Sequence, residues 1–146
     1  MGMLAHPSSA VRTEEAAVHQ RACQILVVDD DPSFVHLLKE SLQLEGYKVH
    51  CGYDGQAALQ LAHQYAFHLI ILDVNMPMTN GLKVFEYLRS SPDTVKIPVI
   101  FITGELSKDV YSSIARHQRV AHLKKPLDLE SFNSVVRLFL DSYPVT

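Results

Sequence analysis

The chain has 146 residues, with 13 Lys and Arg against 16 Asp and Glu, a formal net charge of −3 and 47% hydrophobic residues. This length is typical of one globular domain, and the apolar fraction is too high for a disordered chain. The mildly acidic balance argues against direct binding to nucleic acid or to an anionic membrane. Because the sequence shows neither a membrane-spanning apolar run nor a signal-peptide pattern, we expect a cytoplasmic protein.

The N-terminal segment differs from the rest of the chain. Residues 1–22 show weak periodicity and a Pro-Ser-Ser break, which indicates an extension that is disordered or forms a short helix. We therefore expect the folded domain to cover residues 23–146.

From residue 24 onward, apolar strand patterns alternate with helical patterns. The first helix is predicted to begin at Asp31-Pro32, a carboxylate cap followed by proline, and to end before Gly46. Asp54 and Asp128 are predicted to cap two later helices. Regular alternation of this kind predicts a doubly wound α/β fold, a parallel sheet with helices on both faces. The predicted strands cover residues 24–29, 47–51, 68–73, 97–103 and 120–123.

The two cysteines are predicted to be free thiols. Cys23 precedes the first strand and Cys51 ends the second, so parallel strands place them at opposite ends of the sheet. Their number and spacing fit neither a disulfide framework nor a zinc site.

Polar residues follow the carboxyl ends of four predicted strands. They are Asp29 and Asp30, Asp73, Thr103 and Lys125. In an open parallel sheet these ends share one edge, where functional groups gather. Two carboxylates 4 Å apart repel by about 4 kcal/mol at an effective dielectric constant of 20, so such a site needs cations. Lys125 supplies one, and Mg²⁺ bound by oxygen ligands suits the other, an arrangement typical of phosphoryl transfer.

Each of these residues also has an ordinary structural explanation. An Asp after a strand is often only a helix cap, and we interpret Asp31, followed by Pro32, in that way. Lys124 is interpreted as a solvated charge. Asp73 is different, because the next helix begins only near Gly81 and leaves it no cap to form. The joint placement at four strand ends therefore favours a functional site.

The segments ILVVDDDP, LIILDVNMPMTNG, VIFITG and LKKPL occur in this order between residues 24 and 141. They resemble the receiver domain of bacterial two-component response regulators. The resemblance implies a flavodoxin-like (βα)5 sheet with strand order 2-1-3-4-5. It is nearest to the stand-alone chemotaxis-type receivers.

The resemblance implies a role for each acidic residue. Asp73 matches the phosphoacceptor, which takes a phosphoryl group from a histidine kinase or a histidine phosphotransfer protein. Asp29 and Asp30 match the acidic pair that binds Mg²⁺ together with Asp73, and the main-chain carbonyl of Asn75 matches the remaining protein ligand.

The resemblance also implies a switch. Lys125 matches the cation that pairs with the phosphoryl group, and Thr103 matches the hydroxyl that moves to bind it. The Lys125-Pro126 bond matches a bend that receivers often make through a cis peptide, and Gly81 is interpreted as permitting a backbone turn. His122 stands where receivers usually carry a rotating Tyr or Phe. It is interpreted either as a solvent-facing residue or as a pH-sensitive switch.

Two flanking residues, Asn75 and Glu105, resemble the positions that set the lifetime of the acyl phosphate. Their polar side chains predict fast self-dephosphorylation, because they could orient an attacking water.

The leading hypothesis is a phosphorylation-controlled signalling domain that is no enzyme beyond its own phosphorylation and dephosphorylation. A downstream protein would bind the face formed by the helix over 107–117, the strand over 120–123 and the last helix, which is also a candidate homodimer surface.

One alternative is a receiver fragment of a larger multidomain regulator or hybrid kinase. An aspartyl-phosphate phosphatase is disfavoured because Asn75 replaces the second acid such enzymes usually carry. A flavodoxin-like cofactor binder is disfavoured because the acids at 29–31 replace a phosphate-binding loop.

Overall fold

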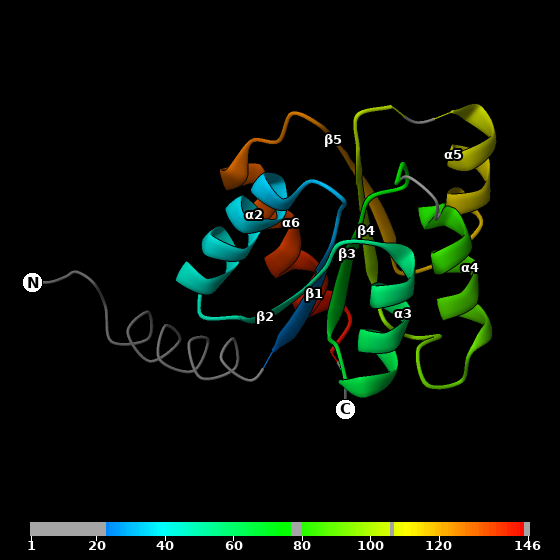
Figure 1. The fold of residues 1–146 in the computed structure, drawn as a ribbon, viewed down its shortest axis with the longest axis horizontal. Coiled ribbons are helices and arrows are strands. Elements are labelled where there is room, and N and C mark those ends of the chain that lie inside the picture. The colour runs from blue at the N-terminus through cyan, green and yellow to red at the C-terminus, as the bar shows by residue number, and fades with distance from the viewer. Residues whose placement is uncertain (1–22, 77–79, 106, 145–146) are drawn as a thin grey trace, which may run out of the picture.

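The computed structural model describes residues 23–76, 80–105 and 107–144 and shows a three-layer α/β fold (Figure 1). The predicted extension over 1–22 lies outside the described residues. The sheet has five parallel strands in the order β2-β1-β3-β4-β5, which confirms the predicted topology. The strands are β1 (Gln24–Val28), β2 (Lys48–Gly52), β3 (Leu69–Leu72), β4 (Val99–Thr103) and β5 (Val120–Lys124). The helices are α2 (Pro32–Leu44), α3 (Gly55–Gln64), α4 (Gly81–Ser90), α5 (Lys108–Ala115) and α6 (Leu129–Ser142).

Helices cover both faces of the sheet, α2 and α6 on one side and α3, α4 and α5 on the other (Figure 1). Successive residues of a strand point to opposite faces, so an apolar run supplies both cores. In β3, Leu69 and Ile71 pack on the α2–α6 side, whereas Ile70 and Leu72 pack on the α3–α5 side.

The helix termini follow the predicted local chemistry. The Asp31 side chain accepts hydrogen bonds from the main-chain N–H groups of Ser33 and Phe34, and Pro32 is the first helical residue. Asp54 and Asp128 cap α3 and α6 in the same way. Gly46 follows α2 with φ of 95°, a conformation that glycine adopts without strain.

Both cysteines are free thiols, as predicted. Within the described part of the chain, no helix has the length and apolar character needed to cross a membrane.

The strand register places the polar strand ends together. Val28 of β1 pairs with Leu72 of β3, and Thr103 of β4 pairs with Lys124 of β5. The residues that follow β1 and β3 therefore leave the sheet side by side, next to the end of β4. This edge carries the candidate site.

Candidate functional site

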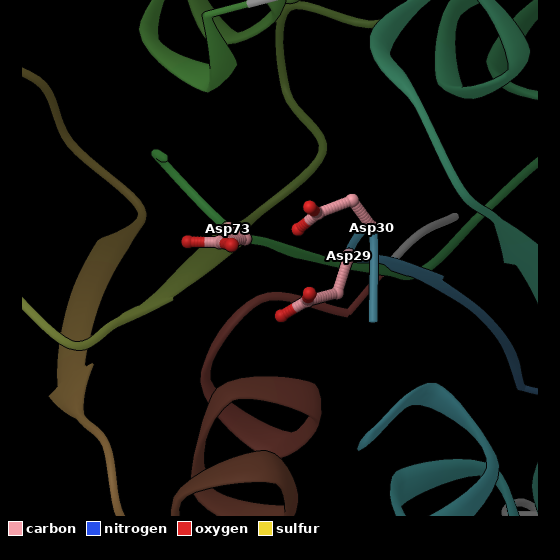
Figure 2. A group of neighbouring side chains, drawn as sticks. All are labelled: Asp29, Asp30 and Asp73. Atoms are coloured by element: carbon pink, nitrogen blue, oxygen red, sulfur yellow. The ribbon is translucent and has the colours of Figure 1, made fainter. Parts of the chain in front are cut away.

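Three carboxylates meet at the carboxyl edge of the sheet. Asp29 and Asp30 follow β1, and Asp73 follows β3; their side chains gather at this edge in Figure 2. Each offers an oxygen within 4.8 Å of the others. Asp29 and Asp73 are buried, with 2% and 4% of their surface exposed, whereas Asp30 is exposed. The cluster is therefore buried on its sheet side and open to solvent through Asp30.

Main-chain N–H groups orient the two buried carboxylates. Oδ1 of Asp29 accepts a hydrogen bond from the N–H of Asp31 at 2.9 Å. Oδ1 of Asp73 accepts one from the N–H of Asn75 at 3.1 Å. Both are turns that an Asp side chain forms with the backbone two residues on. Each acid thus keeps its second oxygen directed into the site.

Lys125 places a cation among these acids. Its Nζ lies 2.7 Å from Oδ2 of Asp29 and 3.7 Å from Oδ2 of Asp73, and 4.4 Å from the centroid of the Phe34 ring. Burial lowers the pKa of Lys125, but the hydrogen bond to Asp29 and the three carboxylates together raise it above its usual value. Lys125 is therefore a stable cation whose direct partner in this structure is Asp29.

The predicted acceptor is harder to ionise than an ordinary aspartate. Burial raises the pKa of Asp73, and the charges of Asp29 and Asp30 raise it further. The hydrogen bond from Asn75 and the charge of Lys125 act in the opposite direction without cancelling the effect. Any added cation at this edge would favour ionised Asp73.

The donor set fits a hard divalent cation. Three carboxylates supply the oxygen ligands that Mg²⁺ prefers, and the exposed side at Asp30 leaves space for the waters this ion retains. One Lys balances only one of the three acids, so the cluster carries excess negative charge that a divalent ion would neutralise.

A second group of hydrogen bonds surrounds Thr103, which is fully buried. Nδ2 of Asn75 donates to Oγ1 of Thr103 at 2.8 Å and to the main-chain oxygen of Glu105 at 3.0 Å. Oγ1 of Thr103 donates to the same Glu105 oxygen at 3.0 Å. Sequence reasoning placed these residues near the site but missed this triangle. Its only sequence signal is a donor side chain two residues after the acid.

His122 does not face solvent freely. Its ring is partly buried, and its Nε2 atom is buried without a hydrogen-bond partner among the described residues. It lines a 530 Å³ surface cavity together with Thr103, Lys108, Tyr111 and Lys124. His122 is thus partly buried in the lining of this surface cavity near Thr103, and both interpretations of its role stay predictions.

Gly81 is needed for a different reason than the sequence suggested. It begins α4 and has no left-handed φ; instead, a Cβ there would overlap the main-chain oxygen of Asp73 and lie 2.8 Å from Cα of Val74. The expected permissive turn is thus replaced by close backbone packing, which fixes the loop that carries Asp73. The Lys125-Pro126 bond is cis, as the resemblance implied.

The topology and the acidic edge define a doubly wound α/β protein with its candidate site residues at the carboxyl ends of β1, β3, β4 and β5. Residues 25–137 match the family model of the response regulator receiver domain. The chain belongs to this family, whose members are signalling domains of two-component systems.

Curated relatives include the response regulator ArlR of Staphylococcus aureus, 34% identical over 83% of this chain and 54% of that protein. A probable cyclic di-GMP phosphodiesterase of Vibrio cholerae is 30% identical over 82% of this chain and 27% of its own length. The chain thus spans about half of these relatives or less.

Solved structures show the same fold. The chemotaxis protein CheY4 of Vibrio cholerae matches with a TM-score of 0.75 and 29% identity, covering 81% of this chain and 98% of that one. The receiver domain of a histidine kinase from Syntrophus aciditrophicus matches with a TM-score of 0.76 and 30% identity, covering 86% and 95% of the two chains.

Proposed function

We propose that Asp73 accepts a phosphoryl group from a phosphohistidine of a histidine kinase or phosphotransfer protein. An oxygen of the Asp73 carboxylate bonds to phosphorus while the phosphorus–nitrogen bond breaks, and the bonding electrons stay on the donor imidazole. The observation that carries the proposal is the position of Asp73: a buried carboxylate that caps no helix, with Nζ of Lys125 at 3.7 Å.

Mg²⁺ is the proposed cofactor, held by Asp29, Asp30, Asp73 and the main-chain carbonyl of Asn75. When bound, it neutralises charge on the transferring oxygens. The residues of the chain do the rest: the Asn75 N–H fixes the Asp73 carboxylate, and the exposed Asp30 keeps the edge accessible to a partner.

Lys125 and Thr103 are the proposed responders to phosphorylation. A phosphoryl group on Asp73 brings new anionic oxygens, which compete with Asp29 for the Lys125 ammonium. The Thr103 hydroxyl is proposed to donate a hydrogen bond to one of these oxygens. His122 is proposed to be the switch ring that moves together with Thr103. Asn75 and Glu105 are proposed to set the lifetime of the acyl phosphate by orienting a water molecule.

The downstream partner is proposed to bind the face formed by α5, β5 and α6, which is also the proposed dimer surface. This face contains the cavity next to Thr103 and two exposed cations, Lys108 and Lys124. Tyr111 beside them exposes 57% of its surface. A change at Thr103 would therefore alter a surface that a protein can read.

The test is phosphorylation with acetyl phosphate and Mg²⁺, followed by intact-mass analysis. Wild type should gain one phosphoryl group, and Asp73→Asn should gain none. Asp54→Asn is the matched control, because Asn caps a helix as well as Asp does and position 54 only caps α3. Labelling of Asp73→Asn to the wild-type extent would overturn the proposal.

The competing phosphatase hypothesis has its own measurement. Repeated turnover of a small phosphate ester by wild type would support it, whereas labelling that stops at one phosphoryl group per chain would exclude it. A shift of the folded state between two conformations, rather than product release, is the expected output of a receiver.

A further inference from the structure

We propose that the side-chain amide of Asn75 is a latch that holds Thr103 and the loop after β4 in the unphosphorylated arrangement. This role is separate from the proposed metal-ligand role of the Asn75 main chain and from its proposed effect on phosphate lifetime. The mechanism of release rests on the proposed phosphorylation of Asp73, but the latch itself is a property of the free protein.

The amide nitrogen of Asn75 donates to two acceptors. Nδ2 donates to the Thr103 hydroxyl at 2.8 Å and to the Glu105 carbonyl at 3.0 Å, and these two groups are themselves joined at 3.0 Å. A side-chain amide nitrogen has two protons to donate, and two acceptors lie within hydrogen-bond distance of this one. The three groups form a closed triangle that spans the loops after β3 and β4.

The triangle of hydrogen bonds engages the Thr103 hydroxyl, the group that is proposed to move toward the phosphoryl group. A threonine hydroxyl can donate one hydrogen bond, and that of Thr103 donates it to the Glu105 carbonyl. It cannot donate to a phosphoryl oxygen until that bond breaks. The Asn75 amide stabilises the engaged position, because it bonds to both the hydroxyl and the carbonyl that accepts from it.

Asn75 also contacts the acceptor side of the site. Its main-chain N–H donates to Oδ1 of Asp73, so one residue connects the proposed acceptor with the proposed switch. Phosphoryl oxygens on Asp73 would attract nearby N–H and O–H donors more strongly than a neutral carbonyl does, since charge-assisted hydrogen bonds are about twice as strong. Arrival of the phosphoryl group would then draw the Thr103 hydroxyl away from the Glu105 carbonyl and from the Asn75 amide.

The first experiment tests the latch in the free protein, without phosphorylation. Side-chain amide exchange with water is measured by ¹⁵N NMR in wild type and in Thr103→Ala. Loss of a partner should accelerate exchange at Asn75 by about threefold to tenfold, the equivalent of one ordinary hydrogen bond. Asn80, whose side chain uses its oxygen to accept from Leu82, is the internal reference and should not change.

The second experiment measures the effect on the switch. Binding of beryllofluoride with Mg²⁺, a stable phosphoryl mimic, is titrated through the main-chain amide signal of Gly104, a residue that is unchanged in every variant of this test. Asn75→Ala should bind the mimic about tenfold more tightly, since the free state loses stabilising hydrogen bonds. Asn133→Ala, which removes an amide between α6 and α2, is the matched control and should bind as wild type does.

A double-mutant cycle separates a latch from a general loss of structure. If Asn75 acts through Thr103, the effect of Asn75→Ala on mimic affinity should shrink to about twofold or less in the Thr103→Ala background. An equal effect in both backgrounds, or unchanged or weaker binding by Asn75→Ala alone, would overturn the latch. Failure of wild type to bind the mimic would count against the proposed function, while the exchange experiment would still decide the latch.

Discussion

Nζ of Lys125 lies 2.7 Å from Oδ2 of Asp29, a contact between residues 96 positions apart in the chain. In this structure the ammonium therefore neutralises one of the proposed metal ligands and lies farther from the proposed acceptor. A divalent ion at the acidic edge would take over the charge balance of Asp29. It would thereby leave Lys125 free to move toward Asp73.

We predict that Lys125→Met destabilises the metal-free protein by about 1–3 kcal/mol, because it leaves the buried Asp29 without its cation. Saturating Mg²⁺ should restore part of that loss by supplying positive charge. Urea unfolding with and without Mg²⁺ measures both effects. Lys124→Met, at the exposed neighbouring position, is the control and should change stability by less than about 0.5 kcal/mol.

We predict that Gly81→Ala destabilises the protein by about 1–3 kcal/mol and slows phosphorylation, because its Cβ would overlap the main-chain oxygen of Asp73. Gly104→Ala is the control for stability, since a Cβ there meets no atom within 4 Å. Thermal unfolding and the rate of labelling by acetyl phosphate are the measurements. Equal unfolding midpoints for the two variants would contradict the close packing of Gly81 on the acceptor loop.

We predict that Asp30→Asn weakens Mg²⁺ binding by about tenfold or more, because a neutral amide is a poorer ligand for a hard cation than a carboxylate. Mg²⁺ should raise the melting temperature of wild type, and the variant should need correspondingly more ion. Asp31→Asn, at the adjacent acid that caps α2, should titrate as wild type does. If the melting temperatures of both variants depend on Mg²⁺ concentration in the same way, Asp30 is not a ligand of the metal site.

We predict a pH effect at His50, remote from the acidic edge. Burial lowers the pKa of His50 below its ordinary value of 6.5, and the charge of Lys48 lowers it further. The folded state then binds fewer protons than the unfolded chain between the lowered pKa and 6.5. The contribution of the neutral His50 ring to the free energy of unfolding is therefore complete above pH 6.5. It decreases as the pH falls from 6.5 through the lowered pKa.

Urea unfolding at several pH values checks this effect in wild type and in His50→Gln. The variant should lose stability less steeply on acidification, because it has no imidazole to protonate. The ring packs against that of Tyr65 with centroids 4.2 Å apart and planes tilted by 33°, so the variant should also be somewhat less stable at neutral pH. The same pH slope in both proteins would exclude His50 as its source.

The sequence alone was enough to predict the fold and the location of the acidic edge. Alternating apolar strands and capped helices permit few topologies, and parallel strands bring their carboxyl ends to one side. Asp31, Asp54 and Asp128 cap helices as predicted, because capping depends only on residues two or three positions away. The proximity of Asp29 and Asp73 follows from pairing of β1 with β3.

Only the tertiary structure decided which side chains touch across the site. It paired Lys125 with Asp29, joined the Asn75 amide to Thr103 28 residues away, and placed His122 in the lining of the cavity that Thr103 also lines. Such contacts depend on rotamers, on register and on the packing of separate loops, none of which a residue type reveals. The packing of Gly81 against Asp73 has the same origin. The sequence thus determined where the charges gather, because topology is a property of patterns. The structure decided which partner each charged group contacts, because a hydrogen bond or ion pair depends on side-chain positions within a few ångströms.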